Sequence, residues 1–169
     1  TTELVTVIGT PTITGTASVC VGLTTTLAGS GTPNPLTPWV SATPAVATVS
    51  STGVVSGIAA GTSVITYMNS TGCTQTQTVT VNPLPAITSA TTGGVCSGLA
   101  QNYVITSDIG STYTWTRAAV TNITPAIGSG TGSPLTETLT NITTGPIVVR
   151  YSIIPTATAS GCAGAPFDY

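Results

Sequence analysis

The chain has 169 residues, of which only 4% are charged: two are Lys or Arg, four are Asp or Glu, and His is absent. Typical soluble domains carry about a quarter charged residues, so hydration of this surface falls mainly to its many Thr and Ser hydroxyls. The basic residues are Arg117 and Arg150 alone, which excludes the basic footprint that nucleic acids and anionic lipids require. No run approaches the roughly 18 apolar residues of a membrane span, and acid–base catalysis lacks its usual His or tuned Lys. We therefore expect no enzyme, no cofactor, no metal site, no nucleic-acid partner and no membrane insertion.

The first half of the chain shows short strands separated by turns. β-Branched and hydroxyl residues alternate with a period of two, which is typical of strands with one buried face. In 76–81, Thr-Gln-Thr-Val-Thr-Val, the valines can enter a core while the polar side chains face water. Gly53, Gly57 and Gly61 indicate tight turns. The predicted strands are 4–8, 24–27, 45–49, 63–68 and 74–81.

The second half continues the same pattern, with strands predicted at 102–107, 111–117, 135–139 and 147–154. A turn-rich stretch, Gly-Ser-Gly-Thr-Gly at 128–132, separates two of them, and no segment has a helical period. Between the halves, Asn82-Pro83-Leu84-Pro85 contains two prolines that cannot donate ladder hydrogen bonds, so we interpret it as a short, stiff linker. The predicted domains are 1–83, which begins with a leading linker strand, and 84–169.

An internal repeat supports two similar domains. Val5-Thr6-Val7, Pro11 and Val19-Cys20 recur as Val79-Thr80-Val81, Pro85 and Val95-Cys96, roughly 75 residues later. A period of this size suits one small β-sandwich. Trp39 and Trp115 each follow the first cysteine of their domain, Cys20 and Cys96, by 19 residues, and we interpret each indole as filling a sandwich core.

The four cysteines favour one disulfide within each domain, Cys20 with Cys73 and Cys96 with Cys162, because separate domains fold separately. Two other connectivities stay open. Zinc is the rival interpretation, but it usually uses a close Cys-x-x-Cys pair, which is absent. Disulfides favour an oxidising, extracellular location.

Two stretches resemble bacterial surface domains. Residues 41–49 (SATPAVATV), 53–62 (GVVSGIAAGT) and 65–67 (ITY) resemble the bacterial immunoglobulin-like group 2 (BIG2) signature, and residues 113–117, 137–141 and 161–167 resemble PKD-like modules. The resemblance implies immunoglobulin-like sandwiches of the kind found in very large surface adhesins of Bacteroidetes, including type IX-secreted adhesins and gliding-type filaments.

The two domains differ at their ends. The first closes with Thr78-Val79-Thr80-Val81 after its second cysteine, whereas the second stops at Phe167-Asp168-Tyr169, so we expect it to lack its last strand. The run containing Leu4, Val5 and Val7 is a strand of the missing type. Together with Phe167 and Tyr169, these residues are the predicted strand-completion residues. Either the chain is one window of a longer tandem polypeptide, or separate subunits complete each other by donating a strand.

The predicted fold class is therefore all-β, with two tandem immunoglobulin-like sandwiches joined by a Pro-containing linker. We expect a repeat unit of an extracellular, cell-surface filament or giant adhesin, whose partners are copies of itself or adjacent repeats. The alternative is a carbohydrate-binding or spacer module of a secreted polysaccharide-degrading enzyme, with surface glycans as partners. That function needs exposed aromatic residues, and the chain has only 2 Trp, 5 Tyr and 1 Phe. Sequons begin at Asn69, Asn122 and Asn141 and are compatible with glycosylation.

Overall fold

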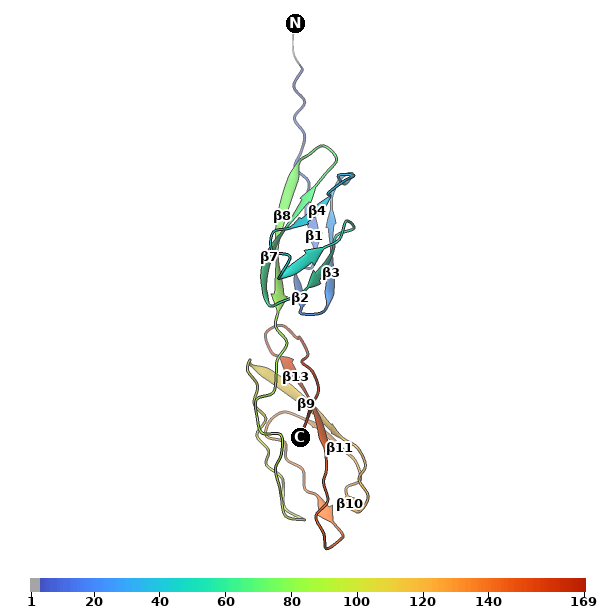
Figure 1. The fold of residues 1–169 in the computed structure, drawn as a ribbon, viewed down its shortest axis with the longest axis vertical. Coiled ribbons are helices and arrows are strands. Elements are labelled where there is room, and N and C mark those ends of the chain that lie inside the picture. The colour runs from blue at the N-terminus through green and yellow to red at the C-terminus, as the bar shows by residue number, and fades with distance from the viewer. Residues whose placement is uncertain (1–3) are drawn as a thin grey trace. The chain divides into compact units, whose positions relative to one another are not determined.

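The computed structural model describes residues 4–169, which divide into two compact units with the boundary between Pro83 and Leu84. Every regular element in the described part of the chain is a β-strand, so the predicted all-β class is confirmed (Figure 1). No helix long and apolar enough to cross a membrane occurs in residues 4–169.

The first unit is a sandwich of two four-stranded sheets. One contains, in order, β1 (Ile13–Gly15), β3 (Thr24–Gly29), β6 (Val54–Gly57) and β5 (Ala47–Val49). The other contains β2 (Ser18–Cys20), β8 (Thr74–Asn82), β7 (Gly61–Met68) and β4 (Trp39–Ser41). Pairings are antiparallel except that of β2 with β8, which is parallel and places Cys20 beside Asn82.

The second unit has one four-stranded and one two-stranded sheet. The larger contains β11 (Gly128–Thr131), β9 (Ser111–Arg117), β13 (Tyr151–Ala157) and β14 (Phe167–Asp168), all antiparallel. The smaller pairs β10 (Ile123–Thr124) with β12 (Thr140–Asn141). The predicted strands 102–107 and 135–139 form only isolated bridges, such as Tyr103 with Leu135. The ladder does not continue to Ile105, because the Ser133 hydroxyl bonds both the N–H and the carbonyl of that residue.

Each unit has its own core, and each core contains one tryptophan, as interpreted from the sequence. Trp39 packs on Tyr67 with ring centroids 4.7 Å apart, and Trp115 meets Tyr151 edge to face at 5.7 Å. The first core consists of Val19, Leu27, Trp39, Ala47, Val55, Ile65, Tyr67, Val79 and Val81. The second consists of Ile105, Trp115, Ile123, Leu135, Leu139, Tyr151 and Ile153.

The predicted disulfides are wrong. Cys73 and Cys96 are free thiols, whereas Cys20 and Cys162 are disulfide-bonded. The reason in the first unit is strand direction: Cys20 lies beside Asn82 at one end of β8, and Cys73 precedes Thr74 at the other. Strand rise places these ends about 26 Å apart, whereas bonded cysteines have Cα atoms within about 7 Å.

The same reason holds for Cys96 and Cys162. The backbone N–H of Ala157, at the end of β13, donates to Cys162. Cys96 lies instead beside β12, since Ser97 Oγ accepts a hydrogen bond from the Asn141 N–H. β12 pairs with β10, which follows the Arg117 end of β9. Since Arg117 is opposite Tyr151, the two cysteines lie beyond opposite ends of β13, about 20 Å long by strand rise.

Candidate functional site

The candidate site is an incomplete edge of the larger sheet in the second unit. β9 accompanies β13 along its whole length, from Tyr151 to Ala157. On the other side, β14 pairs only with Ser152 and Ile153, and Tyr169 adds two backbone hydrogen bonds to Tyr151, of 2.8 and 3.0 Å. The preceding segment, 146–150, forms no backbone hydrogen bond with any residue that the structure describes. The backbone there is free to accept a strand.

A groove of about 520 Å³ lies along this open edge. Its lining comes mainly from 91–95 and 146–151, which include Arg150, and also contains Ile123, Leu139, Asp168 and Tyr169. Gln101 also lines the groove, and its Nε2 is a buried donor for which no acceptor is found among the described residues. A buried amide without an acceptor is costly, so an occupant that offers a carbonyl would remove that penalty.

The structure places Tyr169 in the lining of the groove and Phe167 nearby in β14, so the second unit has the beginning of a last strand. Phe167 lies opposite Ile153 in β14. The ring of Tyr169 stacks on Tyr103 with centroids 3.7 Å apart and planes inclined by 11°. Burial, and secondarily the nearby Tyr103, raise the pKa of the Tyr169 phenol. The last strand is therefore short rather than missing.

Leu4, Val5 and Val7 are not in a strand. Their side chains are 98%, 85% and 91% exposed, and residues 4–10 join no sheet. In an extended chain Val5 and Val7 point to one face and Thr6 to the other. Such exposure of neighbouring apolar side chains is unusual for a predicted strand. Within the described residues, this predicted strand has no partner strand.

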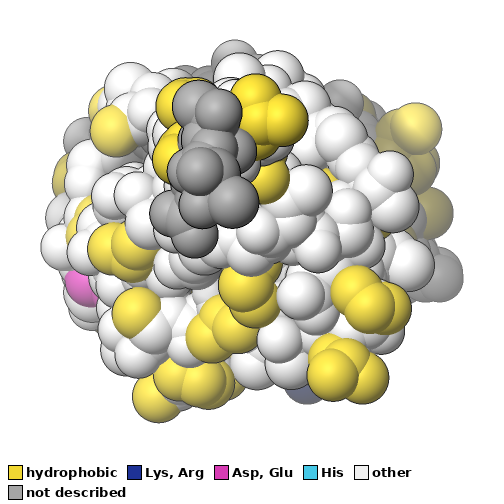
Figure 2. Space-filling model, turned by 90° about the horizontal axis from the view of Figure 1, so that it is seen from above, with side chains coloured by type: hydrophobic (Ala, Val, Ile, Leu, Met, Phe, Trp, Pro, Cys, Tyr) yellow, Lys and Arg dark blue, Asp and Glu magenta, His cyan; other side chains and the backbone are white. Residues whose placement is uncertain are grey.

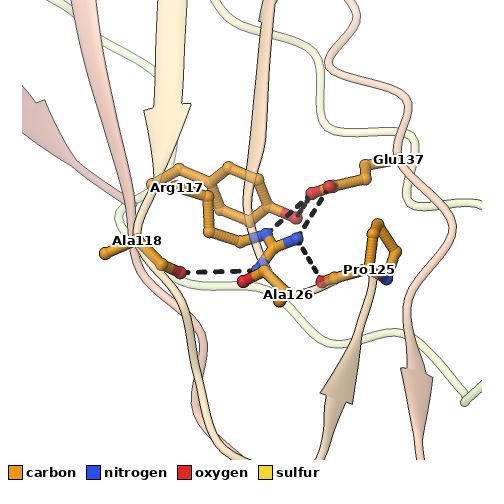
Figure 3. A network of polar contacts seen from close by, with 6 residues as sticks. Arg117, Ala118, Pro125, Ala126 and Glu137 are labelled. Atoms are coloured by element: carbon orange, nitrogen blue, oxygen red, sulfur yellow. Dashed lines mark hydrogen bonds and ion pairs between the residues drawn. The ribbon is translucent and has the colours of Figure 1, made fainter.

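A buried polar network centred on Arg117 and Glu137 meets the groove at Tyr151 (Figure 3). Tyr151, which lines the groove, donates its hydroxyl proton to Glu137 Oε2 at 2.6 Å. Glu137 also receives two hydrogen bonds from Arg117, of 3.0 Å from Nε and 2.9 Å from an Nη. The remaining guanidinium N–H groups reach the carbonyls of Ala118, Pro125 and Ala126. All five donors of Arg117, which is 3% exposed, therefore have acceptors.

The network shifts the pKa values of Arg117, Glu137 and Tyr151. The hydrogen bond to Glu137 raises the pKa of Arg117, against the opposing effect of burial. Burial by itself would raise the pKa of Glu137, but the hydrogen bonds from Arg117 and Tyr151 lower it below its ordinary value. Burial and the hydrogen bond to Glu137 raise the pKa of Tyr151. The carboxylate and the guanidinium are therefore held in their charged forms.

The three sequons lie in different environments. Asn69 is 9% exposed, and its Oδ1 accepts hydrogen bonds from Thr71 and Cys73 in the β7–β8 hairpin. Asn141 is half-buried and donates to Gly145. Asn122 is exposed, with a left-handed φ of 65°. If the chain is glycosylated, we propose Asn122 as the accessible position.

Sequence reasoning did not identify the groove walls, Gln101 or the network as a unit. The one available signal was the pair of opposite charges, Arg117 and Glu137, in a chain almost without charge. No group of three or more metal-ligating side chains occurs in residues 4–169.

Comparison with known proteins finds a family model that matches most of the second unit. Residues 93–169 match the family model of the PKD-like domain, and the BIG2 resemblance of the first unit stays a prediction. The chain is similar to the crystal structure of the S-layer protein rSbsC(31-844), with 15% identity and a TM-score of 0.36 over 83% of this chain and 27% of that one. It is also similar to domains 4–9 of surface layer protein SbsC, with 14% identity and a TM-score of 0.34 over 85% of this chain and 33% of that one. The chain thus spans a third or less of the length of these structures. No curated protein matches it.

Proposed function

We propose that the chain is a structural repeat of an extracellular cell-surface assembly in which copies join head to tail. Residues 4–8 of one copy lie in the groove of the second unit of the preceding copy, beside 146–150, and continue the line of β14. The observation that carries this proposal is the match between the two surfaces: an open sheet edge with a groove lined partly by apolar side chains, and an exposed segment with four apolar residues around Thr6.

Strand geometry supports the fit. The donated segment and the open edge each have five residues, about 17 Å of extended chain. Because β14 is antiparallel to β13, a segment that continues β14 is also antiparallel to the open edge. It can place Val5 and Val7 in the groove and its backbone against 146–150. Burying one valine is worth about 1.5 to 3 kcal/mol, and backbone pairing adds affinity, as in other cases of strand addition.

Composition and cysteine chemistry support an exported, self-associating protein. Cys20 and Cys162 are disulfide-bonded, which is typical of extracellular proteins. The face drawn in Figure 2 shows hydrophobic side chains scattered among uncharged polar ones, with very little acidic or basic surface. Such a surface offers little electrostatic repulsion between copies.

The alternative, a carbohydrate-binding module, has less support. Sugar platforms need exposed aromatic rings, yet Trp39, Trp115, Tyr67 and Tyr151 are buried. The other four aromatic residues, Tyr103, Tyr113, Phe167 and Tyr169, are only partly accessible. None of the aromatic side chains in residues 4–169 is therefore fully exposed, as a flat platform for a glycan would be.

Sedimentation velocity and negative-stain electron microscopy test the proposal on the Cys73→Ser/Cys96→Ser variant. This variant keeps the bonded cysteines and removes the free thiols, so only non-covalent association is measured. We expect linear oligomers that grow with concentration. Adding Val5→Asp and Val7→Asp should return the chain to monomers, because burying two carboxylates is costly and the groove lining offers a single cation, Arg150, as a partner.

The matched control is Thr6→Asp, which places one carboxylate on the opposite face of the same segment and should allow oligomers to form. Monomers at all concentrations, or oligomers that are insensitive to Val5→Asp and Val7→Asp, would contradict strand donation. A denaturing gel of native surface material separates the two forms of head-to-tail joining: covalent tandem repeats remain long, and donated strands release single repeats.

A further inference from the structure

The free thiols lie at comparable ends of their units. In each unit we call the end that borders the linker the linker pole and the opposite end the distal pole. In the first unit the linker pole carries Asn82 and Cys20. The distal pole carries the β7–β8 hairpin with Cys73, whose carbonyl accepts from the Asn69 N–H at 3.0 Å, and neighbouring Ser70 donates to Thr32.

In the second unit the linker pole carries Ala86, which donates to Asp108 at 2.8 Å, and Cys162. The distal pole carries β10, β12 and the turn containing Cys96, where Gly98 donates to Leu139. The two linker-pole cysteines are disulfide-bonded, and the two distal-pole cysteines are free. Cys96 is exposed and Cys73 is half-buried.

In the head-to-tail junction proposed above, the groove brings the distal pole of one copy's second unit close to the distal pole of the next copy's first unit. Val95 and Ser97, the neighbours of Cys96 on either side, both line the groove. The segment proposed to occupy it, 4–8, leads through Gly9 and Thr10 to Thr12. The Thr12 carbonyl accepts from Ser30 at the distal pole of the first unit, the pole of Cys73. Ile8, which the proposal places in the groove, is separated by only three residues from Thr12 at that pole, which is about 13 Å of extended chain between their Cα atoms.

We propose that Cys96 of one copy forms a disulfide with Cys73 of the next copy and so locks the head-to-tail junction. This inference rests on the proposed function, because strand donation is what brings the two poles together. The reaction is thiol–disulfide exchange with a low-molecular-weight disulfide. The exposed Cys96 thiolate attacks that reagent and releases one of its thiols. The Cys73 thiolate then attacks the Cys96 sulfur and releases the second thiol, so that two protein thiols are oxidised and one reagent disulfide is reduced.

The test uses the chain, incubated with oxidised glutathione and analysed on non-reducing gels. The wild-type chain should give a ladder of oligomers that reducing agent collapses. Cys73→Ser and Cys96→Ser should each remain monomeric alone, because each lacks one half of the junction. Their equimolar mixture should give dimers and nothing larger. Chymotryptic mapping of that dimer should find the peptide with Cys73 linked to the peptide with Cys96, and Cys20 and Cys162 still bonded.

The outcomes separate the disulfide from strand donation. If either single variant alone formed dimers as fast as the mixture does, the thiols would be pairing indiscriminately, and the proposal would be overturned. A monomeric mixture, when the Cys73→Ser/Cys96→Ser chain oligomerises in sedimentation, would also overturn it while leaving strand donation intact. A linked mixture without non-covalent oligomers would support the disulfide and contradict strand donation. In the supporting case, Val5→Asp with Val7→Asp should slow linkage at least tenfold, and Thr6→Asp should not.

Discussion

Arg117 and Glu137 form a buried ion pair in the second unit. Their side chains are 0% and 10% exposed, with a 2.9 Å ion pair. Removing one partner leaves a buried charge uncompensated, which typically costs 3 to 5 kcal/mol. We therefore expect Glu137→Gln to lower the free energy of unfolding of the second unit by about 3 kcal/mol in urea denaturation. Asp168→Asn, which changes an exposed carboxylate, should change it by less than about 0.5 kcal/mol. Equal effects would mean that the network contributes no special stability.

At Gly130 the structure leaves no room for a side chain. A Cβ atom at this position would lie 2.5 Å from the Trp115 ring, and the indole is held by Tyr151 on its other side. Overpacking of this kind costs about 1 to 3 kcal/mol, so Gly130→Ala should destabilise the second unit by that amount. Gly110→Ala is the control, since nothing lies within 4 Å of its added methyl. A neutral Gly130→Ala would show that Trp115 can move aside.

At the scale of elements, periodicity predicted strands where the pairing is regular. The prediction 111–117 coincides with β9, and 74–81 differs from β8 by one residue. The prediction from periodicity was incomplete where a segment needs a partner strand from elsewhere in the chain or from another copy. Residues 4–8 (Leu-Val-Thr-Val-Ile) and 147–150 (Ile-Val-Val-Arg) consist mainly of strand-forming apolar residues, but neither segment is paired in the structure. Alternation reports one buried face, and whether a partner strand exists is decided outside the segment.

Hydrogen exchange tests the open edge directly. The amides of 147–150 have no backbone acceptor among the described residues, so in monomers they should exchange within seconds to minutes. The amides of β13 that pair with β9 should be protected. On assembly, protection should appear in 147–150 and in 5–8 together. Protection of either segment alone, measured by mass spectrometry on peptides from the same sample, would contradict their pairing.

At the scale of the whole molecule, cysteine order along the chain did not predict cysteine partners. Equivalent positions in the repeat suggested one bridge per unit, but spacing carries no information about which pole a residue occupies. The parallel pairing of β2 with β8 places Cys20 at the linker pole, and the β7–β8 hairpin places Cys73 at the distal pole. The candidate site escaped prediction for a similar reason, since its walls, 91–95 and 146–151, lie about 50 residues apart in sequence.

The distribution of charge over the two units predicts different responses to acid. Residues 4–83 contain no Asp, Glu, Lys or Arg, whereas Asp108, Glu137 and Asp168 all lie in the second unit. The folded-state pKa of Glu137 is lowered from an ordinary value of 4.5. Its contribution to stability is therefore present above about pH 4.5 and is lost as the pH falls through the folded-state pKa.

Urea denaturation at pH 7 and pH 3 measures this difference in two variants, Trp39→Phe and Trp115→Phe, each of which keeps one indole as the reporter of one unit. Between these pH values the midpoint of the second unit should fall while that of the first stays constant. Glu137→Gln should remove most of the acid sensitivity of the second unit, because no carboxylate then remains beside Arg117. An equal fall in both units would mean that acid acts through the unfolded chain as a whole and not through the buried carboxylate.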